Sequence, residues 1–282
     1  MHPSDPTTDQ TVHTPLRGLS FDFPAAFRDV ADAVRLWPIW LTLSWVEFNN
    51  TYRRSVVGFA WVILSFAAFV FIKLTIFSSL LDTDNPGYYD AFLVLGFFAW
   101  YYLSPAVIGA PESFVSAQGW IRSESLPYSL YLLKTIMREF YNFALTSIVT
   151  IGALIYLKVP VTAMAWLVVP AVLFYILTAF SLKLLLGIIG ARFRDIAHLI
   201  RAVMLPLMFL TPIFWMPSQM PGLMKYLWWN PLYHYLEILR APILDGRFPV
   251  ESWIFCGVVF AIITTLAFLL FARFKQRIVF WF

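Results

Sequence analysis

The chain has 282 residues, of which 60% are hydrophobic and only 13% are charged, with a net charge of +4. A soluble domain carries about 25% charged residues, so this composition excludes an ordinary soluble protein. The apolar residues come in blocks of roughly twenty, the length that a helix needs to cross the hydrocarbon core of a bilayer. Backbone polar groups must be paired within such a segment, so the sequence predicts an all-α integral membrane protein.

The N-terminal fifth of the chain precedes the first apolar block. Residues 1–23 are polar and contain no apolar core like that of a signal peptide, and we predict a disordered cytoplasmic tail. Residues 24–56 are predicted to form an amphipathic interface region. Within it an aromatic and apolar stripe recurs at spacings of three and four, which fits one side of a helix over 38–52 (Trp37, Leu41, Trp45, Phe48 and Tyr52). Tryptophan and tyrosine favour the headgroup level, so we expect this helix to lie in the inner interface and not to be a short first span.

The transmembrane domain is predicted over 57–282, with six spans at about 57–81, 91–111, 136–157, 163–187, 198–215 and 253–271. An even number of spans places both termini on one side. With the termini in the cytoplasm, fifteen of the 20 lysines and arginines lie at cytoplasmic ends or loops. This bias satisfies the positive-inside rule, and it explains the basic charge without a nucleic-acid partner. We expect a multi-pass protein of the inner (plasma) membrane.

Two connections differ from simple loops. In the cytoplasmic loop at about 116–135, Ser125 precedes an apolar helical pattern and Pro127 suits a first helical turn. The pattern predicts a short helix exposed to the cytoplasm, either a partner-binding element or a mere connector. The outer segment 216–249 contains too many prolines for a span and too many apolar residues for a solvated loop. Two short helices that pack on the membrane domain or dip into it are expected there, and they could form a lid.

Most catalytic and metal-binding motifs are absent from the sequence. No G-x-x-x-x-G-K-[ST] phosphate-binding loop is found, so the chain alone is not expected to hydrolyse nucleotide. The four histidines are far apart, and no metal site or cofactor is predicted. Among charges near the spans, Lys73 and Lys183 are expected to reach the interface, and Glu112 and Glu139 to be interfacial. A membrane-embedded enzyme of glycan assembly would need acidic or histidine clusters that are not seen.

Six segments together resemble the membrane subunit of ABC-2-type polysaccharide exporters, which export lipid-linked O-antigen and related glycans. They are YRRSVVGFAWVILS (52–65), SESLPYSLYLLKTIMREF (123–140), GARFRDIAHLI (190–200), FLTPIFW (209–215), NPLYHYLEILRAPIL (230–244) and RIVFWF (277–282). The segments follow the family's order and cover nearly everything after the polar tail. ABC-2 exporters of drugs or lipids share the layout but lack the NPLYHYLEILRAP and FWF signatures, and they remain the alternative.

The resemblance implies a homodimer in the membrane with two copies of a separate ABC ATPase subunit, which would bind ATP and magnesium. The short cytoplasmic helix resembles the coupling helix that docks on the ATPase (Ser125, Leu126, Pro127, Tyr128 and Leu130). The outer segment resembles the extracytoplasmic gate helices, with aromatic gate residues Tyr226, Trp228, Trp229 and Tyr233. The substrate would be a polysaccharide linked to polyprenyl diphosphate.

Basic and aromatic residues are the candidates for substrate contact. Arg53, Arg54, Arg192 and Arg194 could receive a diphosphate headgroup, because guanidinium groups match phosphate oxygens bidentately; alternatively they only fix the topology. The resemblance places the first and fifth spans at the dimer centre. Their aromatic residues could line a path along which a glycan slides (Phe59, Phe66, Phe69, Phe209, Phe214 and Trp215). The alternative is that these rings face lipid.

Overall fold

The computed structural model describes residues 21–80 and 85–281, which are helical throughout apart from turns and short connections. The predicted all-α architecture is confirmed for this part of the chain. The main helices are α1 (Phe23–Arg35), α2 (Trp37–Tyr52), α3 (Ala60–Leu80), α4 (Pro86–Ile108), α5 (Gln118–Ser123), α6 (Tyr128–Tyr156), α7 (Val168–Arg192), α8 (Asp195–Leu210), α9 (Met224–Leu227), α10 (Pro231–Leu244) and α11 (Val250–Phe274). Short 3-10 turns include η1 (Ala163–Leu167) before α7 and η4 (Lys275–Phe280) after α11.

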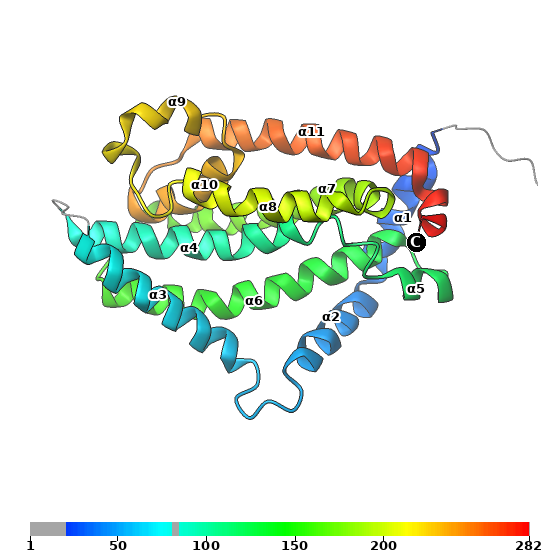
Figure 1. Cartoon of the computed structure of the whole chain (residues 1–282), viewed down its shortest axis with the longest axis horizontal. Coiled ribbons are helices and arrows are strands. Elements are labelled where there is room, and N and C mark those ends of the chain that lie inside the picture. Colours follow the sequence, from blue (N-terminus) through cyan, green and yellow to red (C-terminus); the bar gives the residue numbers. More distant parts are fainter. Residues whose placement is uncertain (1–20, 81–84, 282) are drawn as a thin grey trace, which may run out of the picture.

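The long helices run side by side and give the molecule two distinct ends (Figure 1). One end, which we call the terminal end, holds α1, α5 and the C-terminus. The opposite end, which we call the α9 end, holds α9, the end of α3 and the start of α4. Both ends of the described chain therefore lie at the same end of the bundle, as an even number of crossings requires.

Four of the described helices are long and apolar enough to cross a membrane: Gly87–Ile108, Tyr128–Tyr156, Ala163–Arg192 and Val250–Phe280. They coincide with four of the six predicted spans. The other two predicted spans form α3 and α8 in the expected order. Ala60–Ile76 is a shorter apolar helix, and the 16 residues of α8 extend about 24 Å, less than the roughly 30 Å of a hydrocarbon core.

Helix α4 lies at the centre of the packing. Its start is set by Asn85, whose side chain accepts a hydrogen bond from the Tyr88 amide at 3.2 Å, and by Pro86 in the first turn. It packs against α3, α6, α7, α8 and α10. Beyond its end the chain touches α7, and a Cβ at Gly190 would lie only 2.2 Å from the Pro111 carbonyl oxygen. Only glycine permits this backbone contact.

The predicted interface region is corrected in two respects. Asp22 caps α1 by accepting a hydrogen bond from the Ala25 amide at 3.0 Å, so the C-terminal end of the predicted disordered tail is ordered; residues 1–20 lie outside the described part. The predicted stripe on α2 does form one face, since Trp45 and Phe48 stack at 6.0 Å and Phe48 contacts Tyr52 at 5.4 Å. Part of this face packs on α6 and not on the membrane interface: Phe48 is buried against Tyr141, with 5.5 Å between the ring centroids, whereas Trp37 and Trp45 are exposed.

Helix α1 has the clearer amphipathic pattern. Its small residues Ala26 and Ala33 are buried. A separate stripe at spacings of four and seven remains exposed (Phe23, Phe27 and Val34). An exposed apolar stripe beside the membrane-spanning helices suits the headgroup region, so the interface region contains two helices, α1 and α2.

Candidate functional site

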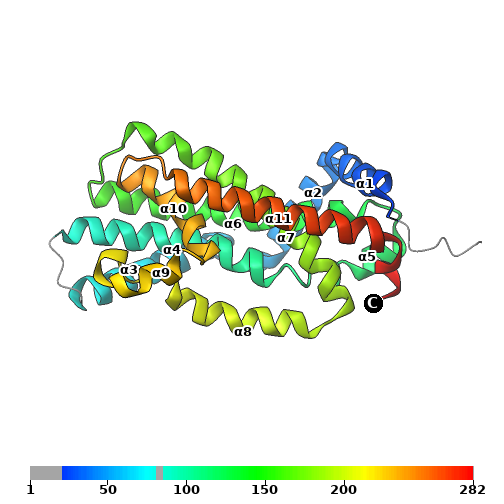
Figure 2. The ribbon, with the colours of Figure 1, turned by 90° about the horizontal axis from the view of Figure 1, so that it is seen from above.

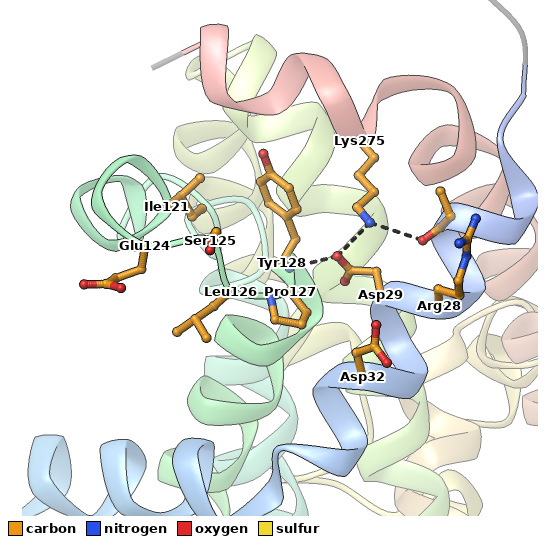
Figure 3. Close-up of a pocket in the computed structure, with 11 residues that line it drawn as sticks. Arg28, Asp29, Asp32, Ile121, Glu124, Ser125, Leu126, Pro127, Tyr128 and Lys275 are labelled. Atoms are coloured by element: carbon orange, nitrogen blue, oxygen red, sulfur yellow. Dashed lines mark hydrogen bonds and ion pairs between the residues drawn. The ribbon is translucent and has the colours of Figure 1, made fainter.

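A cleft of about 570 Å³ opens at the terminal end, between α1, the α5–α6 connection and the start of η4 (Figure 3). Charged and apolar side chains line it together: Arg28, Asp29, Asp32, Glu124 and Lys275 with Ile121, Leu126, Pro127 and Tyr128. Arg28, Asp32 and Glu124 are exposed. The mixture is typical of a surface that binds another protein and excludes a purely lipid-facing groove.

The buried Asp29 of α1 bonds to the start of α6 and to Lys275, and so joins the elements that form this cleft. Its carboxylate accepts hydrogen bonds from the amides of Tyr128 and Ser129 at 3.0 and 2.9 Å, and it pairs with the Lys275 ammonium at 3.0 Å (Figure 3). The first amides of a helix have no partner within the helix, so Asp29 of α1 caps α6 from 99 residues away in sequence. Sequence reasoning missed Asp29 and Lys275, because a cap from another helix leaves no local pattern.

The predicted coupling helix is corrected. The short helix is α5, Gln118–Ser123, and it ends before Ser125. Tyr128 and Leu130 belong instead to the first turn of α6, because Asp29 caps that turn. Leu130 is buried against α1 and cannot contact a partner, whereas Ser125 is exposed and Leu126 and Pro127 line the cleft.

The candidate path aromatics form one connected run, except for Phe59. Ring centroids are 6.5 Å apart for Phe66–Phe69, 4.9 Å for Phe69–Phe97, 5.1 Å for Phe97–Phe214 and 5.4 Å for Phe214–Phe209. Trp215 joins it by donating its indole N–H to the Phe209 carbonyl at 3.0 Å. Phe97 of α4 was not predicted, yet it links the two predicted spans. We call these six residues the aromatic run.

Parts of the aromatic run are exposed and parts are buried. Phe209 and Phe69 are 59% and 39% exposed, whereas Phe66, Phe97, Phe214 and Trp215 are buried. The Lys73 ammonium lies 5.6 Å and 5.5 Å from the ring centroids of Phe69 and Phe214. This cation–π contact places Lys73 among aromatic rings.

The prediction for Lys183 is corrected. Its side chain does not extend to water, because it is fully buried and pairs with Glu139 of α6 at 2.8 Å. The pair lies beside Gly109, directly after the end of α4, and the interfacial role of Glu139 stays a prediction. Glu112 pairs with Arg201 of α8 at 3.0 Å, and about half of each side chain is exposed.

The outer segment holds two helices of unequal length, and the longer one packs into the membrane domain, as one of the expected alternatives requires. Only α9, of four residues, and short 3-10 turns are surface elements. Helix α10 packs between α4, α7, α11 and η1, and its residues 234–242 are all buried. Burial is possible because the polar side chains of α10 find partners. Arg240 binds Glu237 of the same helix, and Glu237 also accepts a hydrogen bond from Arg247 at 3.0 Å.

The same helix fixes the non-helical segment 211–215 that follows α8. Arg240 donates to the Pro212 carbonyl at 2.9 Å, and the side-chain amide (Nδ2) of Asn230 donates to the Thr211 hydroxyl at 3.0 Å. Tyr89 of α4 donates to the Phe214 carbonyl at 2.7 Å. Segment 211–215 carries one end of the aromatic run, so α4 and α10 determine where that end lies.

The predicted gate aromatics separate into two sets. Trp228 and Tyr233 surround His234, at centroid distances of 5.3 and 5.0 Å, whereas Tyr226 and Trp229 are exposed and outside this cluster. The two ring nitrogens of His234 lie 3.0 Å from the Ser252 hydroxyl and from the Trp228 carbonyl. A neutral imidazole that donates from Nε2 and accepts at Nδ1 satisfies both. Burial lowers the pKa of His234 below its ordinary value of 6.5.

The four candidate headgroup arginines are exposed but lie in two places. Arg53 and Arg54 occupy the α2–α3 connection, which Figure 1 shows partway along the molecule and apart from the α7–α8 junction. Arg54 has a φ of +74°, unusual for a residue other than glycine. Arg192 lies over the Trp281 ring at 5.6 Å, and Arg194 precedes α8. The single chain does not bring the two pairs together.

Comparison with known proteins agrees with this architecture. The family model described as ABC-2 type transporter matches residues 39–244. The chain is also 23% identical, over 212 residues, to the O-antigen export system permease protein RfbA of Myxococcus xanthus, a match that covers 72% of this chain and 79% of that relative. The family match spans α2 to α10 and includes the aromatic run and segment 211–215. The resemblance inferred from the sequence is therefore confirmed, and the chain belongs to the ABC-2 type transporter family.

Proposed function

We propose that this chain is the membrane-spanning permease subunit of an ABC exporter for polysaccharide linked to polyprenyl diphosphate, of the O-antigen type. The substrate moves from the cytoplasm across the inner membrane. The observation that carries the proposal is the match with an O-antigen export permease over 72% of the chain. The aromatic run supports it, because flat rings can contact the apolar faces of sugars without holding them at fixed hydrogen bonds.

The terminal end is cytoplasmic in this proposal, and the α9 end faces outward. Two chains form the pore, and α3 and α8 of each chain face the other chain. Figure 2 shows α8 along one edge of the molecule. Only Ala197 and Met204 of α8 are buried, and its exposed side includes Leu199, Leu205 and Phe209. An apolar helix with so little packing suits a protein partner or lipid.

The ATPase subunit docks at the cleft on the terminal end. The exposed residues of this cleft, and not Leu130, make the contact. Movement of the partner then reaches two helices at once, because Asp29 ties α1 to the first turn of α6. ATP and magnesium bind to the partner subunit, since the sequence lacks a phosphate-binding loop.

The substrate headgroup enters at the exposed arginines, and the glycan follows the aromatic run. Arg53 and Arg54 receive the diphosphate of the substrate first, because the α2–α3 connection lies beside the first predicted span. Arg192 and Arg194 belong to the second basic position at the start of α8. In the dimer, the run from each copy lines one side of the path.

The deciding experiment deletes the chain in cells that make a lipid-linked polysaccharide and locates the glycan. We expect glycan to accumulate on the cytoplasmic side, and the chain together with its genomically neighbouring ATPase to restore surface display. A complex whose ATPase is stimulated by a drug or simple lipid, but not by lipid-linked glycan, would favour the alternative ABC-2 exporter. A purified chain that modifies glycan without a partner would favour an enzyme.

Docking is tested separately by reversing charge in the cleft. Glu124→Lys combined with Ser125→Arg changes only exposed side chains, so we expect normal membrane insertion and at least about a tenfold loss of ATPase co-purification. Lys158→Glu, exposed on the connection between α6 and η1, is the matched charge-reversal control. Equal co-purification of both variants with wild type would contradict docking at this cleft.

A further inference from the structure

A second cavity, of about 320 Å³, lies at the α9 end between the start of α10, the 245–249 connection and the first turn of α11. Its walls include Trp228, Tyr233, Glu237, Arg247, Phe248 and Glu251. The volume is at the lower end of the range for ligand sites. We propose that this cavity is a saccharide-binding subsite that takes a pyranose ring. Its role in export rests on the proposed function, but saccharide binding can be measured without export.

The cavity presents two large aromatic rings. Trp228 and Phe248 are 45% and 46% exposed although both line a concave site. Neighbouring rings hold them in place: Trp228 is edge-on to His234 at 5.3 Å, and Phe248 stacks on Trp253 at 6.1 Å with an interplanar angle of 11°. Rings that are supported from behind lose little conformational freedom when a flat apolar surface covers them. The C–H face of a pyranose is such a surface.

The polar wall offers donors and acceptors side by side. Arg247 is about half exposed, and its hydrogen bonds to Glu237 and Asp245 use two of the five N–H donors of a guanidinium. The exposed Glu251 provides a carboxylate acceptor, whereas both oxygens of the Glu237 carboxylate already accept from Arg240 and Arg247. Sugar hydroxyls both donate and accept, so they can bond to both kinds of group.

Other ligand classes fit this wall less well. No group of three His, Cys, Asp or Glu side chains within residues 21–80 and 85–281 could hold a metal ion. An anion would be attracted by Arg247 but repelled by the carboxylates of Glu237 and Glu251, so it would bind weakly. A purely apolar ligand would cover the charged Arg247 and Glu237 without replacing their contacts with water.

The cavity also lies next to the end of the proposed glycan path. Glu237 in its wall binds Arg240, and Arg240 donates to the Pro212 carbonyl in segment 211–215. A saccharide at this site could come from the transported glycan as it leaves, or from a glycolipid of the outer leaflet. Both present the same ring chemistry.

Binding is tested with the chain in nanodiscs of phosphatidylethanolamine and phosphatidylglycerol, without glycolipid. The probes are the methyl glycosides of glucose, mannose, galactose, rhamnose and N-acetylglucosamine, measured by saturation-transfer NMR. We expect at least one to bind, and Trp228→Ala and Arg247→Gln each to weaken its Kd at least about fivefold. Trp166→Ala, which removes a 64% exposed ring, and Lys158→Gln are the matched controls. Absence of binding, or equal binding by all variants, would overturn the subsite.

The source of the saccharide is distinguished in cells by replacing Phe248 with the photo-cross-linker benzoylphenylalanine. A glycan cross-link that requires a hydrolysis-competent partner ATPase identifies the transported chain, and one that persists with an inactive ATPase identifies a resident glycolipid. A cell that displays glycan normally but gives no cross-link contradicts the subsite and leaves the export function intact. Glycoside binding by a chain that exports no glycan contradicts the export function alone.

Discussion

At each end of the bundle, one charged side chain makes hydrogen bonds to the backbone of a segment that is distant in sequence. At the terminal end Asp29 accepts from the Tyr128 and Ser129 amides, and at the α9 end Arg240 donates to the Pro212 carbonyl. Asp29 lies on the wall of an open cleft. Arg240, by contrast, is 2% exposed and lies 3.6 Å from the centroid of the Phe92 ring.

The difference shows that one kind of contact, a charged side chain bonded to a distant backbone group, can border an open cleft or a closed core. An open charged cleft leaves side chains available to a second protein, as the docking proposed for this end requires. A guanidinium packed between a ring and a carboxylate has no room for a partner, and it fixes the position of segment 211–215 instead. The proposed saccharide subsite lies just outside this closed cluster, where Arg247 reaches solvent.

The largest effect is expected from Arg240→Met at the α9 end. The change leaves Glu237 without its buried partner and the Pro212 carbonyl without its donor, so the free energy of unfolding should fall by about 3–5 kcal/mol. Thermal unfolding of the purified protein in detergent, followed by tryptophan fluorescence, measures it.

Arg247→Met is the matched control for this variant. Its side chain is 55% exposed, and loss of a solvent-exposed ion pair should cost no more than about 1 kcal/mol. Equal destabilisation by the two variants would show that burial does not distinguish the two arginines.

Asp29→Ala should have the next largest effect, of about 2 kcal/mol. It removes the cap of α6 and leaves the Lys275 ammonium, 24% exposed, without its carboxylate. Asp32→Ala, one turn later on α1 and paired only with the exposed Arg35, should stay within about 0.5 kcal/mol of wild type. The same thermal measurement applies, and a larger loss from Asp32 than from Asp29 would refute the capping role.

Acidification should weaken the α9 end through His234. Because burial holds its pKa in the folded state below 6.5, the unfolded chain binds more protons as the pH falls, and stability that is present above about pH 6.5 is progressively lost. His234→Phe removes this titration. We expect its unfolding midpoint to depend less on pH between 7.5 and 5.5 than that of wild type, whatever its absolute stability; a steeper dependence would count against the assignment.

The smallest effect is expected from Arg201→Gln. Its ion pair with Glu112 joins α8 to the chain after α4, but about half of each side chain is exposed. Exposed pairs are screened by water and contribute about 0–1 kcal/mol. We expect the unfolding midpoint of the variant to lie close to that of wild type in both low salt (about 20 mM) and high salt (about 500 mM). A loss as large as that of Arg240→Met would mean that α8 depends on this one contact.

The sequence predicted what local patterns determine, and it failed where partners lie far apart in the chain. Apolar blocks gave the order of the helices, and family segments gave the ABC-2 architecture. Leu130 was expected to face a partner because no residue near it in the sequence indicates that Asp29 of α1 caps this turn and that Leu130 packs against α1. Lys183 was expected at the interface because its counter-ion, Glu139, is 44 residues away.

The same reason explains α10 and the aromatic run. The prolines and apolar residues of the outer segment predicted short helices packed on the membrane domain, but not how deeply. The polar groups of α10 pair with one another and with the Pro212 carbonyl, so this helix can be buried. Five of six path aromatics cluster, yet only the packing of α4 reveals Phe97 between them. No structural observation tests their role in transport, which stays a prediction.

The joint between Asp29 and Lys275 has a consequence for how the protein is made. The two residues come from opposite ends of the chain, so during synthesis the first turn of α6 receives its cap from α1 well before Lys275 leaves the ribosome. Until then the carboxylate has no counter-ion. The cleft at the terminal end is therefore complete only after the last helix has been made, and an unfinished chain lacks the surface that we propose for ATPase docking.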